Sequence, residues 1–275
     1  MRKKAYISTP KMTGIKVLKD FSVSEIIPFI NWVFFFHEWK FKGSYPALLN
    51  DPEKGEEAMK LLADAKQLLE KMCKEKMIRA NAVVGIFPAG SVKNNVEITI
   101  DNKYKEVIVF ERNRELKNDK EPNLCLADFI APTELNAADH IGMYALTTGI
   151  GIEKWEEEFK KSGDDYSAIM LKILSNRLAE AFAELLHQKI RKEIWGYSPD
   201  ENLTPDELFK EKYHGIRPAP GYPACPDHKL KEKIFSILDA EKNTGIKLTE
   251  NYSMLPSASV CGFYFAHPES RYFGV

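Results

Sequence analysis

Hydrophobic residues recur every three or four positions in five stretches of the chain, the spacing of an amphipathic helix. Capping residues stand near the start of several stretches, such as Ser22, Asp51, Asp164 and Thr204. Gly196 and Gly245 follow two of them, where a helix commonly ends. The predicted helical stretches are residues 22–34, 51–76, 165–195, 204–213 and 229–242.

The period changes after the second stretch to short runs rich in β-branched residues, separated by turn residues at 93–95 and 101–102. These runs, 82–87, 96–100 and 107–110, predict an antiparallel meander. Further candidate strands are residues 124–131, 141–147, 246–249 and 258–265.

Helices and sequence-adjacent strands occur without regular β-α-β alternation, which favours an α+β fold over a doubly wound sheet. We therefore expect a twisted, mainly antiparallel sheet covered by long helices, in a single large domain over residues 21–275. Residues 1–20 are basic and weakly patterned, and we expect them to form a loosely held N-terminal arm.

Charge and cysteine content narrow the class of protein. The 39 basic side chains nearly balance the 40 acidic ones, so no positive field favours nucleic acid or an anionic membrane as a partner. The longest apolar run, 26–36, is shorter than the roughly 20 residues that span a bilayer. Four separated cysteines without a CxxC pair are typical of a reducing compartment. We expect a cytoplasmic protein with no nucleic-acid or membrane partner.

The most distinctive segment is residues 215–228, which contains four prolines and two glycines. Proline fixes its own backbone and biases the preceding residue towards extended conformations, so the segment must be a stiff loop. It is either an ordinary connection between helices or a wall that brings backbone close to a ligand.

Two carboxylates and an imidazole follow one edge of the predicted helix 165–195: Glu180, Glu184 and His187. Three interpretations are open. These residues could be solvated side chains at the flank of the helix, paired with Arg177 and Arg191. They could instead form an acidic wall for a cationic ligand, or a carboxylate metal site. The metal site has the least support, because no second helix supplies a Glu-x-x-His partner.

Other site signals are weak or missing. The sequence lacks the GxGxxG, P-loop and GxSxG motifs. It therefore gives no motif-based support for a dinucleotide-dependent oxidoreductase, an NTPase or a serine hydrolase. Cys225 precedes Asp227 and His228, but neighbours within one loop rarely form a catalytic dyad. Asn31 stands among aromatic residues and needs a partner if buried, either as a helix cap or in a site.

Four segments carry a resemblance to a known family. They are Ala82-Val-Val-Gly-Ile-Phe-Pro88, Arg177-Leu-Ala-Glu-Ala-Phe-Ala-Glu184, Trp195-Gly-Tyr197 and Arg217-Pro-Ala-Pro-Gly-Tyr-Pro-Ala-Cys-Pro-Asp-His228. From about Phe29 to Gly274 the chain resembles the activation domain of cobalamin-dependent methionine synthase. In that family the domain binds S-adenosylmethionine and closes over the cobalamin module. Flavodoxin or a similar reductase supplies an electron to cob(II)alamin, and the resulting cob(I)alamin takes a methyl group from S-adenosylmethionine.

The resemblance also implies a set of ligand-binding residues. Arg217 would hold the methionine carboxylate, and the backbone of Ala219 and the side chain of Tyr222 would line the nucleoside part. Glu180 would lie near the cofactor face or the sulfonium. Tyr272 and its neighbour Phe273 would contact the ligand from the C-terminal segment.

Two departures from the family pattern affect this expectation. Asn31 stands where the family has an aspartate for the ligand's ammonium, so weaker or altered binding is expected. The family domain also continues beyond Tyr272 into a further helical stretch that this sequence lacks.

We therefore expect a free-standing accessory subunit of methionine synthase, a methyltransferase, without catalytic residues of its own. Cobalamin would be carried by the partner, because Asp139-His140-Ile141-Gly142 lacks the spacing of the Asp-x-His-x-x-Gly motif. The alternative is a non-catalytic docking or chaperone module that has lost S-adenosylmethionine. A third possibility is a metal-dependent enzyme using Glu180, Glu184 and His187.

Overall fold

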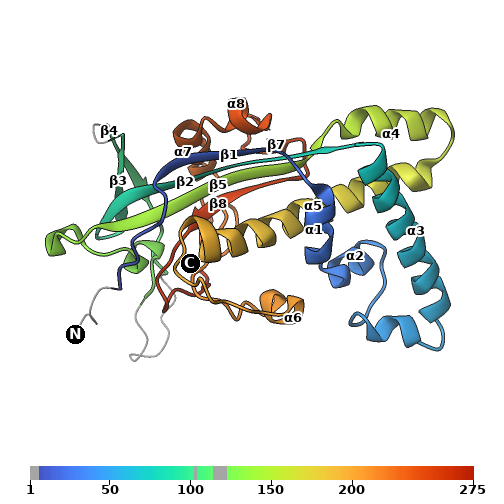
Figure 1. The fold of residues 1–275 in the computed structure, drawn as a ribbon, viewed down its shortest axis with the longest axis horizontal. Helices are drawn as coiled ribbons and strands as arrows, with labels where there is room; N and C mark the ends of the chain where they lie inside the picture. Colours follow the sequence, from blue (N-terminus) through green and yellow to red (C-terminus); the bar gives the residue numbers. More distant parts are fainter. Residues whose placement is uncertain (1–5, 102–103, 114–122) are drawn as a thin grey trace.

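The computed structural model describes residues 6–101, 104–113 and 123–275 and has an antiparallel sheet at its centre (Figure 1). Its strand order is β4-β3-β2-β5-β8, and β1 also pairs with β2. Every pairing is antiparallel, which confirms the predicted α+β class. The strands are β1 (Gly14–Phe21), β2 (Arg79–Val92), β3 (Asn95–Ile100), β4 (Tyr104–Val109), β5 (Asp139–Ile150), β8 (Ser259–Tyr264), and a separate pair, β6 (Lys247–Leu248) and β7 (Met254–Leu255).

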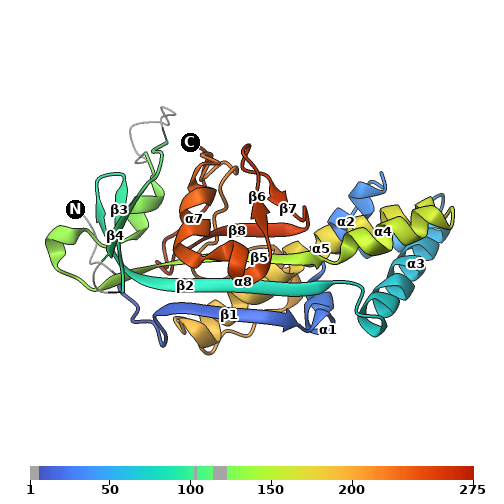
Figure 2. The same cartoon turned by 90° about the horizontal axis from the view of Figure 1, so that it is seen from above.

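The sequence of β2 is an almost continuous apolar run because both faces of this strand are buried. Val84 and Ile86 belong to one hydrophobic core, whereas Val83 and Phe87 belong to the core on the opposite face. Successive side chains of a strand point to opposite faces, so both faces of this sheet are covered. Figure 1 shows α5 on one side of the sheet and α7 with α8 on the other, and in the view from above in Figure 2 α7 and α8 lie over the sheet.

The helical elements surround the sheet and give the long helix α5 a central position. They are α1 (Val23–Ile26), η1 (Ile27–Phe29), α2 (Trp32–Glu38), η2 (Ala47–Asn50), α3 (Gly55–Lys74), η3 (Leu126–Phe129), η4 (Thr133–Leu135), α4 (Ile152–Lys161), α5 (Asp165–Lys189), η5 (Ile190–Ile194), α6 (Pro205–Phe209), α7 (Leu230–Leu238) and α8 (Ala240–Thr244). Helix α5 packs on β5 and β8, and α1, α2 and α3 pack against it. η5 is a π-helical turn that continues α5. Among the described residues, no helix has the length and hydrophobicity needed to cross a membrane.

The N-terminal segment differs from the expected loose arm. Residues 14–21 form β1, which pairs with β2 from Gly14 opposite Ile86 to Phe21 opposite Ala80. Its sequence gave no clear alternation because β1 lies at a sheet edge, where even Ile15 and Val17 remain exposed. Residues 14–21 are extended because they form backbone hydrogen bonds with β2.

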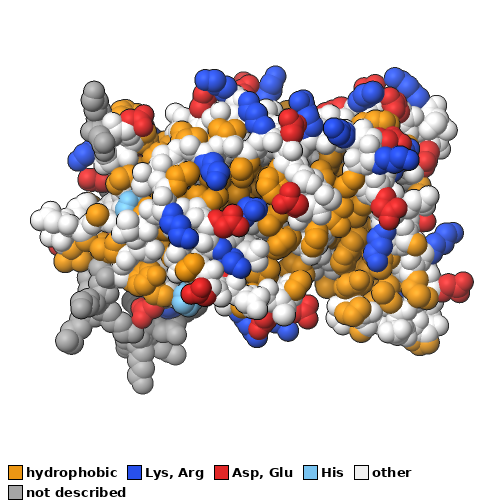
Figure 3. All heavy atoms as spheres, in the orientation of Figure 1, with side chains coloured by type: hydrophobic (Ala, Val, Ile, Leu, Met, Phe, Trp, Pro, Cys, Tyr) orange, Lys and Arg blue, Asp and Glu red, His pale blue; other side chains and the backbone are white. Residues whose placement is uncertain are grey.

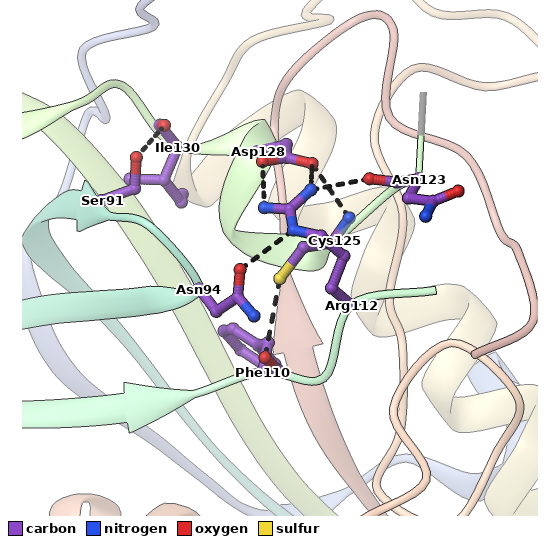
Figure 4. Close-up of polar contacts among 8 residues, drawn as sticks. All are labelled: Ser91, Asn94, Phe110, Arg112, Asn123, Cys125, Asp128 and Ile130. Carbon is purple, nitrogen blue, oxygen red and sulfur yellow. Dashed lines mark hydrogen bonds and ion pairs between the residues drawn. The ribbon is translucent and has the colours of Figure 1, made fainter. Parts of the chain in front are cut away.

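The strand expected at residues 124–131 is also absent: this segment contains the 3-10 turn η3 (Figure 4). Asp128 accepts the Cys125 backbone N–H at 2.9 Å and pairs with Arg112 through two contacts of 2.6 and 2.8 Å. The Arg112 guanidinium also donates to Asn94 Oδ1 at 3.0 Å and to the Asn123 carbonyl at 2.7 Å. Asp128 is the polar exception in an apolar run. It stabilises a turn and links it to Arg112, which follows β4 and contacts Asn94 in the β2–β3 turn.

Candidate functional site

The proline-rich loop 215–228 lies along the edge strand β8. Ile216 exchanges backbone hydrogen bonds with Phe265, at 3.0 and 3.1 Å, and the Pro218 carbonyl accepts the Phe263 N–H at 2.9 Å. Gly262 permits this approach, since a Cβ there would lie 2.6 Å from the Pro218 oxygen. The loop is thus fixed to the sheet and is more than a connection between helices.

Two adjoining cavities lie between this loop, α5 and their neighbours. The first has a volume of about 510 Å³ and the second about 470 Å³, both within the range of small-molecule sites. Four residues line both: Glu180, Glu211, Arg217 and Tyr222. On the face drawn in Figure 3, hydrophobic side chains gather around α2, with acidic and basic groups among them.

The structure brings all seven predicted ligand residues to these cavities. The first is lined by Ala219, Tyr272 and Phe273 besides the shared residues, and the second by Asn31. This placement is geometric, and the binding role of each residue remains a prediction. The residues so placed are Asn31, Glu180, Arg217, Ala219, Tyr222, Tyr272 and Phe273.

Arg217 is the cation common to both cavities, and three side chains hold its guanidinium. Nη2 pairs with Glu184 Oε2 at 2.7 Å, while Nη1 donates to the Tyr213 hydroxyl at 2.7 Å and to His187 Nδ1 at 3.3 Å. Burial alone lowers the pKa of Arg217, but the Glu184 carboxylate and nearby phenols reverse this and raise it well above its ordinary value. Arg217 is therefore a fixed, permanently charged group.

His187 supports Arg217 from inside the protein. Its ring is completely buried, stacks on Tyr264 at 5.2 Å between centroids and meets the edge of Tyr213. Burial, and then the charges of Arg191 and Arg217, hold the pKa of His187 well below its ordinary value. Because arginine can only donate, Nδ1 is the acceptor and the imidazole proton lies on Nε2, which faces the Tyr197 hydroxyl at 3.4 Å.

Of the interpretations that the sequence left open, the one in which Glu184 and His187 are solvated flank residues paired with Arg177 and Arg191 is therefore wrong. Glu184 pairs with Arg217 across 33 positions, and Arg191 makes a buried two-pronged pair with Glu201 at 2.6 and 2.7 Å. Loop docking brings these partners together, which helical spacing cannot reveal. Within the described residues, no three His, Cys, Asp or Glu side chains are grouped to hold a metal ion.

Asn31 caps α2. Its Oδ1 accepts the Val33 N–H at 3.1 Å, so the helical stretch expected from residue 22 is interrupted and begins again at Trp32. Asn31 also lines the second cavity, so the residue combines a capping role with a position at the candidate site.

The C-terminal segment closes one side of the first cavity. The Tyr272 hydroxyl accepts the backbone N–H of Arg217 at 3.1 Å, and the Val275 N–H donates to the Pro223 carbonyl at 3.2 Å. Phe273 packs edge-on against Phe129 at 6.3 Å between ring centroids. Tyr272 is thus held against the proline loop.

Tyr222 presents an aromatic face at the boundary of the two cavities and is 60% exposed. The negative charge of Glu180, followed by partial desolvation, raises the pKa of Tyr222. Cys225, three residues later, is buried, and desolvation raises the pKa of its thiol to about 12. A thiol in that state is not an activated nucleophile, in agreement with the weak sequence signal.

Sequence reasoning missed Glu211 and Tyr144 as cavity residues. Glu211 follows α6 with a left-handed backbone (φ 54°) and lines both cavities. Much of its surface is exposed, yet desolvation of the carboxyl raises its pKa, Arg217 lowers it and Glu184 raises it again. The one sequence signal for Glu211 was the position of an acidic residue between a short helix and the proline loop. Tyr144 lies within β5, and the apolar sequence of that strand indicated only a buried strand.

Comparison with known proteins agrees with this architecture. The family model for the vitamin B12 dependent methionine synthase activation domain matches residues 22–275. A solved structure, the crystal structure of the MetH reactivation domain bound to AdoHcy, is 43% identical in sequence and superimposes with a TM-score of 0.94. The match covers 98% of this chain and 84% of that one. The chain therefore belongs to the family of vitamin B12 dependent methionine synthase activation domains.

Proposed function

We propose that this domain binds S-adenosylmethionine across the two cavities and presents its methyl group to a cobalamin carried by a partner. The observation that carries the proposal is the fixed Arg217 guanidinium, flanked by Glu180, Glu184 and Glu211 at the junction of the cavities. S-adenosylmethionine has a carboxylate, an ammonium and a sulfonium cation, so it requires a cation and several acids close together. The AdoHcy bound to the related structure is a ligand of the same chemical type.

Arg217 retains donors for the ligand carboxylate. Its contacts within the described structure use Nη1 twice and Nη2 once, which leaves Nε–H and the second Nη2 hydrogen. A guanidinium can hold a carboxylate through two such parallel donors. Arg217 would therefore keep its protein partners while it binds the ligand.

The first cavity suits the adenosine part. Tyr144, Tyr222 and Phe273 supply aromatic surface there, and the backbone at Ala219 supplies polar groups at fixed positions. Glu180 and Glu211, at the boundary with the second cavity, would stabilise the sulfonium.

The contribution of this chain to methyl transfer would be positioning. Cobalamin bound to the partner would supply the nucleophile after reduction by flavodoxin or a similar reductase. This domain would fix the methyl donor against it, an effect that needs neither a general base nor a nucleophile from the protein. The four free cysteines fit a cytoplasmic location.

Isothermal titration calorimetry with S-adenosylmethionine tests the proposal. We expect binding by the parent protein and none by Arg217→Ala, whereas Arg112→Lys, remote from the cavities, should bind as the parent does. Absence of heat with the parent at millimolar ligand would remove the donor role.

A non-catalytic docking module is the second candidate, favoured by one observation. Asn31 offers no charge to the second cavity, and its oxygen is already used by α2. A reactivation assay with a separate cobalamin-binding module separates the two functions. A docking module would change the corrinoid spectrum without consuming S-adenosylmethionine.

A further inference from the structure

Glu184 has one carboxylate oxygen without a partner. The residue is 5% exposed and lines the second cavity. Oε2 pairs with Arg217 at 2.7 Å, whereas Oε1 is buried and accepts no hydrogen bond from any described residue. Natural proteins pair nearly all buried polar atoms, because leaving one unpaired forfeits its hydrogen bonds to water without replacement. The Glu184 carboxylate therefore lacks a donor that the described residues do not supply.

The groups around the cavity restrict what that donor can be. Three carboxylates (Glu180, Glu184 and Glu211) and two guanidinium groups (Arg177 and Arg217) line it, so acids exceed bases. This balance favours a cation over an anion next to Glu184.

Asn31 is a poorer acceptor for such a cation than a carboxylate. Its side chain is neutral, and one of the two lone pairs of Oδ1 already receives the Val33 N–H. A positively charged donor entering the cavity is therefore stabilised more by a carboxylate than by Asn31.

The position of Arg217 identifies the donor. In an α-amino acid the ammonium is one carbon removed from the carboxylate. If the carboxylate pairs with Arg217, the ammonium lies within a few ångströms of the same guanidinium. Glu184 is paired with that guanidinium through Oε2, its side chain lines the same cavity, and its Oε1 has no partner among the described residues.

We propose that Glu184 Oε1 accepts a hydrogen bond from the α-ammonium of the ligand and selects for an intact α-amino-acid end. This inference rests on the function proposed above and assigns Glu184 as a specificity-determining residue. Arg217 and Glu184 form a charge-paired site for a zwitterion, while Glu180 and Glu211 stay available to the sulfonium. The shared ion pair also means that the two halves of the zwitterion site are fixed relative to each other.

Calorimetry with two ligands and matched variants tests the proposal. The ligands are S-adenosylhomocysteine and its deaminated analogue, which keeps the carboxylate and carries hydrogen in place of the amino group. The parent should bind S-adenosylhomocysteine at least about tenfold more tightly, the value of one charge-assisted hydrogen bond. In Glu184→Gln the difference should shrink to about twofold, whereas Glu157→Gln, the same change on the exposed side of α4 and outside both cavities, should keep the parental difference.

If the affinity difference between the two ligands is the same in Glu184→Gln as in the parent, the proposal is wrong. Replacing a residue that only supports Arg217, or only binds water, would weaken the binding of both ligands alike. Failure of the parent to bind S-adenosylhomocysteine would refute the proposed function itself, and this inference with it. Binding of both ligands with equal affinity by the parent would refute the inference alone.

Two further measurements cover the case in which Glu184→Gln does not fold. Glu184→Asp keeps the charge that compensates Arg217 and should give an intermediate difference between the ligands. A crystal structure of the parent with S-adenosylhomocysteine needs no variant: the ligand nitrogen should lie about 3 Å from Glu184 Oε1. A separation beyond about 4 Å would overturn the proposal.

Discussion

Replacing Arg217 by alanine should affect both stability and ligand binding, because the guanidinium is part of the fold as well as the site. The change removes the 2.7 Å pair with Glu184 and the contacts with Tyr213 and His187. Glu184 would then be left as a buried carboxylate with both oxygens unpaired.

The magnitude follows from the burial of the two partners. Breaking a buried ion pair by removing one member costs about 3–5 kcal/mol. The Arg217 side chain is 19% exposed and borders two cavities, so water can reach the vacated space and reduce the cost. We expect the free energy of unfolding to fall by about 3 kcal/mol, the lower end of that range.

Arg217→Lys is the informative companion variant. Lysine can keep the charge opposite Glu184 but lacks the planar fork that serves Tyr213 and His187. Loss of those two neutral contacts should cost about 1–2 kcal/mol, while ligand affinity should still fall at least about tenfold.

Urea unfolding, followed by tryptophan fluorescence and circular dichroism, measures the change in the free energy of unfolding. Calorimetry on the folded variants measures the change in ligand affinity. If Arg217→Ala unfolds with the free energy of the parent, the buried pair does not stabilise the fold. If Arg217→Lys binds as tightly as the parent, the two-donor role assigned to the guanidinium is wrong.

Three further predictions concern the supports of the site. Tyr272→Phe removes the acceptor of the Arg217 N–H and should weaken calorimetric binding of S-adenosylmethionine about twofold to tenfold; an affinity equal to that of the parent would mean that this contact does not position the loop. Gly262→Ala places a Cβ 2.6 Å from the Pro218 carbonyl, so we expect a loss of about 1–3 kcal/mol in urea unfolding together with weaker binding, and unchanged values would contradict the close docking of the loop. The pKa of His187 is lowered in the folded state, so its stabilising contribution is present above the unfolded pKa of about 6.5 and is lost below it, by up to about 1.4 kcal/mol per pH unit. His187→Gln should therefore lose less stability than the parent between pH 7 and 5.5, and equal losses would show that the imidazole is not held neutral.

The sequence was sufficient for elements whose pattern reflects burial on a known face. The apolar stripe of α3 and the capping residues Asp164 and Thr204 were recognisable, and the structure confirms both caps. Helix α4 was missed because charged residues dominate it and Ile152 is its one buried residue. Strand β1 was missed because its partner, not its own pattern, determines its conformation.

For the candidate site, the sequence by itself determined the stiffness of the proline loop, the acidic edge of α5 and the family to which these motifs belong, because backbone restriction and residue spacing are local properties. Only the tertiary structure decided that Glu184 and His187 are buried supports of Arg217, that Asn31 caps α2, and that Glu211 joins the cavities. These relations depend on how the loop docks against β8 and α5. Such docking sets distances between residues far apart in the chain, and no local pattern encodes them.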